Sequence, residues 1–166
     1  ADLSVTVMQV VALRAARDAG ITVPRSTIDA AVRYIRRCAT PSGGFLYQPG
    51  RGEPAYSRTA AGVCALLLAG QRAAPETLRG IAYLQQHKQA RGPIYPFYGL
   101  NYASHPIYLA PDPAEWPAWF PTIREELIAS QADDGRWDGE AGPLYGTQMA
   151  VLTLAVPLRQ LPVYQR

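Results

Sequence analysis

Charged residues are few in this sequence, and lysine is nearly absent. Only 17% of the 166 residues are charged, and Lys88 is the single lysine. Arginines gather at Arg33, Arg36 and Arg37, but no basic stripe with interleaved aromatic residues follows them. Because phosphate binding normally needs a concentrated basic surface, we expect no nucleic-acid partner.

Long apolar runs are also missing. No run reaches the ~18 residues that a helix needs to cross a membrane, so we expect no transmembrane segment. Apolar residues still make up 48% of the chain, which is long enough to form one globular domain with a sizeable core. Nothing in the composition assigns a cellular compartment.

Cysteine is scarce, with only Cys38 and Cys64. The pair is compatible with two buried thiols, one disulfide or half of a metal site, and buried thiols are the commonest of these outcomes. Cysteine content therefore assigns neither a redox compartment nor a metal.

Proline and glycine, by contrast, are abundant, and most of them separate stretches of helical period. Gly20 and Gly70 each follow such a stretch and are expected to end a helix. Alternation with period two is absent, so the chain is predicted to be all-α. The expected helices are 4–19, one that Ser26 or Thr27 caps, 57–69, 75–89, 98–109, 116–130 and 145–156.

These helices alternate between two kinds. One kind is small and apolar all round, and a hydroxyl residue recurs in it about every 43 to 53 residues, at Thr6, Thr59, Ser104 and Thr147. The other kind is amphipathic and begins at Thr27, Thr77 or Thr122, and a Gly-rich turn with a large side chain follows each. An apolar helix must be buried on all sides, so the pattern predicts α/α hairpins with inner and outer helices.

One of the turns carries a motif. In "REELIASQADDGRW", Gln131, Gly135 and Trp137 match the Gln-Trp repeat of squalene-hopene and oxidosqualene cyclases. Weaker copies follow the other outer helices, with Phe45 in "GGF" and with Gln89, Gly92 and Ile94 or Tyr95 in the next turn. The chain resembles the C-terminal part of bacterial proteins known as prenyltransferase and squalene oxidase repeat proteins. That resemblance implies an (α/α) toroid, of which this chain would form a part.

The catalytic motifs of that superfamily are missing. The Asp-x-Asp-Asp acid of the cyclases is absent, and Asp133 and Asp134 lie in a turn, where Asp usually caps backbone amides. Ser57 and Arg58 stand where the resemblance to protein prenyltransferases would require a zinc-binding His. We therefore expect no catalytic residue, metal ligand or cofactor in this chain.

Tyrosines provide the candidate site. They cluster at or just before the starts of the inner helices, which would meet at one end of a central cavity and could line an apolar pocket. Filling of the core is the equally open alternative. A lone His on an inner helix is usually a hydrogen-bonded core residue, and otherwise a polar contact in the cavity. The candidate cavity residues are Tyr56, Tyr98, Tyr102, His105 and Tyr145.

The number of hairpins bears on function. Residues 1–166 form a single repeat domain of about three and a half hairpins, whereas a toroid of six hairpins needs roughly 270 residues. We expect the remainder of a larger toroid, a partner chain or a second copy to complete it. The favoured function is a non-catalytic binding or scaffold module that recognises a partner chain or an apolar ligand such as an isoprenoid. The alternative is part of a cyclase-like or prenyltransferase-like lipid enzyme whose acid or zinc site lies outside this chain.

Overall fold

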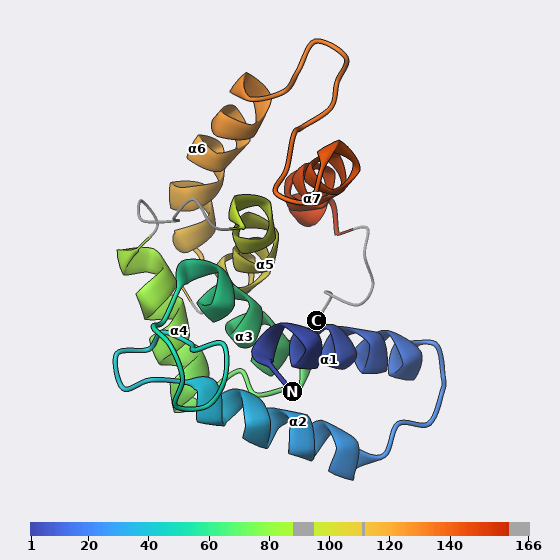
Figure 1. Ribbon diagram of the computed structural model, residues 1–166, viewed down its shortest axis with the longest axis vertical. Coiled ribbons are helices and arrows are strands. Elements are labelled where there is room, and N and C mark those ends of the chain that lie inside the picture. Colours follow the sequence, from blue (N-terminus) through green and yellow to red (C-terminus); the bar gives the residue numbers. More distant parts are fainter. Residues whose placement is uncertain (88–94, 111, 160–166) are drawn as a thin grey trace.

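The computed structural model describes residues 1–87, 95–110 and 112–159 (Figure 1). Within these ranges the chain forms seven α-helices and a short 3₁₀ helix, and it has no β-strand, which confirms the all-α prediction. Three isolated β-bridges lie in the long loop between the second and third helices. The helices are α1 (Leu3–Asp18), α2 (Arg25–Cys38), α3 (Tyr56–Leu68), α4 (Pro75–Gln86), α5 (Pro96–Tyr108), α6 (Glu115–Ala129), α7 (Pro143–Ala155) and the 3₁₀ helix η1 (Val156–Leu158).

The odd-numbered helices pack on one another in order, α1 on α3, α3 on α5 and α5 on α7. Each even-numbered helix packs mainly against the odd-numbered helix that precedes it, so the chain is a succession of helical hairpins (Figure 1). In α3 every residue except Arg58 is buried, whereas α2 buries only Val32, Ile35 and Cys38. The succession of hairpins is as predicted, but among the described helices burial nearly all round is found only in α3 and α5. The end helices α1 and α7 bury no more residues than the outer helices do.

Two helices end as the glycines predict. Gly20 has φ of 83°, and the amides of Gly20 and Ile21 donate to the carbonyl oxygens of Arg17 and Ala16 at 3.0 and 2.9 Å. Gly70 ends α3 with the same pair of hydrogen bonds. Because such a turn needs the left-handed conformation, glycine is strongly favoured there.

The start of α2 differs from the prediction that Ser26 or Thr27 caps it. The helix begins at Arg25 and Pro24 is its N-cap residue, with no side-chain capping bond. The carbonyl oxygen of Pro24 already accepts a hydrogen bond from the amide of Thr27, which places Ser26 and Thr27 inside the first turn. Elsewhere the expected helices begin and end within a few residues of the observed ones, and the expected continuation of the fourth helix to Gln89 lies outside the described residues.

The Gly-rich turns hold the hairpins together through a repeated contact. The amide of Phe45 donates to Oγ1 of Thr59 at 2.9 Å, and the amide of Trp137 donates to Oγ1 of Thr147 at 3.0 Å. In each case a buried bulky residue of the turn is fixed to the hydroxyl group of the following inner helix. Thr59 and Thr147 are in register in the predicted repeat, so the two turns share one structural device.

Candidate ligand site at the tyrosine rim

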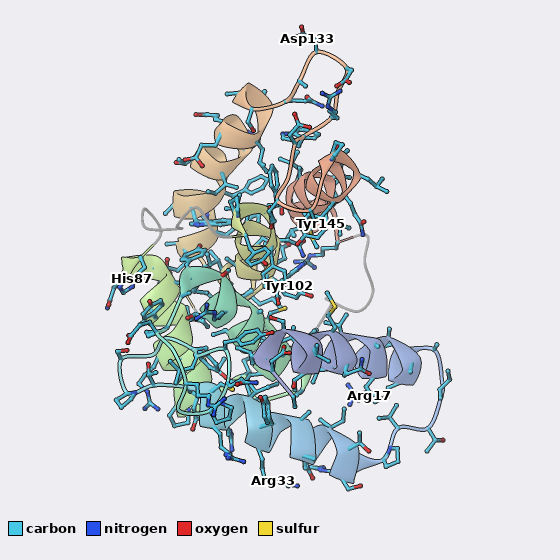
Figure 2. All side chains as sticks on the ribbon, viewed as in Figure 1. Arg17, Arg33, His87, Tyr102, Asp133 and Tyr145 are labelled. Carbon is cyan, nitrogen blue, oxygen red and sulfur yellow. The ribbon has the colours of Figure 1, made fainter. Side chains whose placement is uncertain are left out.

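Four tyrosines lie near the beginnings of three inner helices, and we call this group the tyrosine rim. Tyr56 is the first residue of α3, Tyr98 and Tyr102 lie in the first two turns of α5, and Tyr145 lies in the first turn of α7. Figure 2 shows Tyr102 and Tyr145 where α5, α7 and α1 border the same part of the molecule. The successive packing of the odd-numbered helices is what brings these four residues together.

The rim is built by close contacts on α5. The rings of Tyr98 and Tyr102 are 4.6 Å apart and tilted by 50°, an arrangement that favours aromatic pairing. Gly99 lies against Tyr56, since a Cβ atom built on it would be 3.5 Å from the Tyr56 ring. Tyr56 and Tyr102 are buried, and Tyr98 and Tyr145 are half-buried.

Burial changes the acid–base behaviour of the rim. It raises the pKa of Tyr98 to about 12. Burial also raises the pKa of Tyr145 to about 12, with Glu140 as the next cause, and raises that of Tyr102 further. These phenols are therefore neutral at physiological pH.

His105 lies one turn further along α5. Its side chain is 5% exposed, and burial lowers its pKa to about 3, so the imidazole is neutral at pH 7. Asn101, four residues earlier on the same helix, is 4% exposed, and its Oδ1 atom has no hydrogen-bond partner in the described part of the chain. Asn101 was not among the residues that the sequence pointed to, since an Asn next to a Tyr carries no distinctive signal.

The turn with Gln131, Gly135 and Trp137 connects α6 to α7. The indole N–H of Trp137 donates to the carbonyl oxygen of Leu127 in the last turn of α6 at 2.7 Å, and Nε2 of Gln131 donates to the carbonyl oxygen of Gly135 at 2.8 Å. These bonds satisfy backbone groups that a helix end and a turn leave open. The geometry fits a joint between α6 and α7.

The acidic residues of that turn are on the surface. Asp133 is at the tip of the turn (Figure 2), and Asp134 and Asp138 pair with Arg136 through exposed side chains. Exposed pairs of this kind contribute little to stability. Their position supports the interpretation of these acids as turn residues.

The two cysteines are free, buried thiols and form no disulfide. Burial raises the pKa of Cys38 to about 11 and that of Cys64 further, so neither is a reactive thiolate at neutral pH. Over residues 1–87, 95–110 and 112–159, no group of three or more His, Cys, Asp and Glu side chains is placed to hold a metal ion. In the same ranges, no helix is long and apolar enough to cross a bilayer.

A pocket beside α1 is a second feature that no sequence pattern indicated. A pocket of about 330 Å³ lies between α1, α2 and the end of α3, with apolar walls that include Val10 and Leu68. Three arginines also line it, but Arg14 pairs with Asp18 at 2.8 Å and Arg25 lies 3.9 Å from Asp29. Residues far apart in the sequence line this pocket, so no local pattern of residues predicts it.

Comparisons with family models, with curated proteins and with solved structures found no match for this chain. The relationship to prenyltransferase and squalene oxidase repeat proteins therefore remains an expectation from the sequence.

Proposed function

We propose that this chain is a non-catalytic binding module that holds an apolar, isoprenoid-like ligand against the tyrosine rim. The observation that carries the proposal is the neutral, largely buried tyrosine group that three separate helices contribute. Tyrosine rings offer large apolar surfaces with a polar edge, and such surfaces are typical of sites for small apolar molecules.

Charge at the site favours this ligand class. The raised pKa values of Tyr98 and Tyr145 and the lowered pKa of His105 keep these side chains uncharged at pH 7. Neutral side chains do not penalise the transfer of an apolar molecule from water, and the carboxylate bonded to the rim, that of Glu140, accepts a hydrogen bond from the amide of Tyr98 at 3.1 Å. The same neutrality argues against acid–base chemistry, which works best with groups that titrate near the operating pH.

Asn101 offers a polar contact beside the tyrosine rim. Its buried Oδ1 atom has no partner among the residues that the structure describes, and a buried acceptor gains free energy when it receives a hydrogen bond. Tyr98 is three residues earlier on α5, so the two side chains are neighbours on the helix surface. An isoprenoid alcohol would place a hydroxyl donor at this acceptor and its chain against the rings.

We also propose that the hairpins form an arc of a larger (α/α) toroid. The alternation of buried and amphipathic helices and the repeated contacts of Phe45 with Thr59 and of Trp137 with Thr147 support this architecture. In such an arc the rim would lie at one end of the central cavity. A scaffold role, in which the module binds a partner chain, would use the same arc of hairpins.

Farnesol, an isoprenoid alcohol, is the probe that tests ligand binding. We expect the wild-type chain to bind farnesol in isothermal titration calorimetry and to retain it in native mass spectrometry. Tyr102→Ala should weaken binding about tenfold, which corresponds to roughly 1.4 kcal/mol. Tyr83→Ala on α4 is the control, because Tyr83 stacks on His87 at 4.0 Å and belongs to an outer helix. A folded wild-type chain that shows neither heat nor retained farnesol would contradict the proposal.

A further inference from the structure

The inner helices at the two ends of the arc each leave one face open. On α7, Leu144 is 83% exposed and Val151 is 51% exposed, and Gln148 between them is also exposed. On α1, Val5 is 55% exposed and Met8 is 52% exposed. Contiguous apolar faces of this kind mark interaction sites on soluble proteins.

The register of the repeat relates the face on α7 to a buried face on α1. When Thr147 is aligned with Thr6, the three α7 positions fall on three α1 positions that are almost completely buried where α1 packs against α2 and α3. The same helix face is thus covered in α1 and bare in α7. The exposed residues are Leu144, Gln148 and Val151, and their buried counterparts are Leu3, Val7 and Val10.

The opposite relation holds for the second face, which is exposed in α1 and buried in α7. The exposed positions of α1 fall on α7 positions that are buried, and α7 packs against α5. Each inner helix therefore has one face for the helix that follows it and one for the helix that precedes it. The exposed residues are Val5, Met8 and Ala12, and their buried counterparts are Gly146, Met149 and Thr153.

The exposed face of α7 is the one with which an inner helix contacts the next inner helix, and the exposed face of α1 is the one with which it contacts the preceding inner helix. The two faces are therefore the two sides of the contact that recurs between successive inner helices. Within one copy they do not pack closely on each other, since α1 packs on α3, α3 on α5 and α5 on α7. A second copy of the chain offers each face the complementary surface that it lacks.

Charge favours the same pairing of ends. Residues 1–38 contain six arginines and three aspartates, whereas residues 112–159 contain three arginines and eight acidic residues. The α1–α2 end is therefore basic and the α6–α7 end is acidic. Opposite charges attract in the encounter, whereas two like ends would repel each other.

We infer that a second copy of this chain docks head to tail, with the open face of α7 in one copy on the open face of α1 in the next. Such a contact uses two different surfaces, so it continues until it closes as a ring or extends as a chain. It lies at the ends of the arc and does not depend on ligand binding at the tyrosine rim.

Two surface variants test the direction of the contact. Val151→Glu blocks the α7 face and leaves the α1 face intact, and Met8→Glu does the reverse. In sedimentation velocity we expect the wild-type chain to show at least twice the mass of the 18.1 kDa monomer. Each variant alone should be monomeric, and an equimolar mixture should form a complex limited to one copy of each.

Leu78→Glu on α4 is the matched control, because Leu78 is a 44% exposed apolar residue on an outer helix. It should assemble as the wild type does. Circular dichroism establishes that all the variants are folded, as expected for substitutions at exposed positions. A wild-type chain that stays monomeric at about 100 μM, well above typical dissociation constants of stable assemblies, would overturn the inference. Continued assembly of either single variant, or a monomeric mixture, would do the same.

Discussion

The amide of Trp137 donates a hydrogen bond to Oγ1 of Thr147, and this bond fixes the turn after α6 to the beginning of α7. The indole of the same residue reaches back to Leu127 in α6. One side chain and its backbone thereby connect both helices across the turn. Asp134 and Asp138 pair with Arg136 within the turn, whereas Glu140 accepts a hydrogen bond from the amide of Tyr98 in the tyrosine rim.

Replacement of Trp137 by Ala should lower the free energy of unfolding by roughly 3–5 kcal/mol, as for other large core side chains. Trp137 is buried and bonded at its indole nitrogen, so both apolar contacts and a hydrogen bond are lost. Urea unfolding followed by circular dichroism measures the change. An unfolding midpoint equal to that of the wild type would contradict the role of Trp137 as a joint.

The hydroxyl groups of the inner helices should contribute to the free energy of unfolding through the turns that they bind. Thr59→Val leaves the buried amide of Phe45 without its acceptor, and we expect a loss of about 1–3 kcal/mol. Thr59→Ser is the control, because it keeps the hydroxyl group. If the valine and serine variants unfold at the same denaturant concentration, the hydroxyl group does not hold this turn.

Two helical glycines should respond in opposite ways to alanine. A Cβ atom on Gly146 would overlap the carbonyl oxygen of Trp137 and the backbone of Gly139, so Gly146→Ala should destabilise the joint. A Cβ atom on Gly99 would make ordinary contacts, the shortest at 3.4 Å to Ser57. Gly99→Ala should therefore be neutral or stabilise by up to about 1 kcal/mol through helix propensity. Differential scanning calorimetry of the two variants gives the comparison, and a stable Gly146→Ala protein would exclude the close approach.

Acid should destabilise the fold through His105. Burial lowers its pKa from 6.5 to about 3. Between these two pH values the unfolded chain binds a proton at His105 and the folded chain does not. The contribution of His105 to stability is complete above pH 6.5 and is lost as the pH falls towards 3. Urea unfolding over this range should show a steeper loss for the wild type than for His105→Gln. Parallel curves would mean that His105 is not buried as a neutral side chain.

The division into inner and outer helices could be predicted because it depends on local composition. Arg33, Arg36 and Arg37 mark α2 as an outer helix, and the run around Cys64 has no charge that an inner position would bury. Gly20 and Gly70 could be recognised because each directly follows a stretch of helical period, where a residue in the left-handed conformation ends the helix.

Other features depend on distant parts of the chain and have no local signal. The ring of Phe45 lies against Gly62 and Gly80, which belong to two later helices. The exposure of Leu144 and Val5 could not be read either, because the same residue types are buried elsewhere in the inner helices. The tyrosine rim was predicted by position along the helices, but the buried acceptor of Asn101 emerged only from the packing.

Hydrogen–deuterium exchange of the wild-type chain with and without farnesol tests ligand binding at the tyrosine rim most directly. We expect slower amide exchange in α5 and in the first turns of α3 and α7, where the rim tyrosines lie, and unchanged exchange in α2 and α4. Protection confined to α1 and α2, around the pocket near Arg14, would place the ligand elsewhere. That result, or the absence of any protection, would contradict the account.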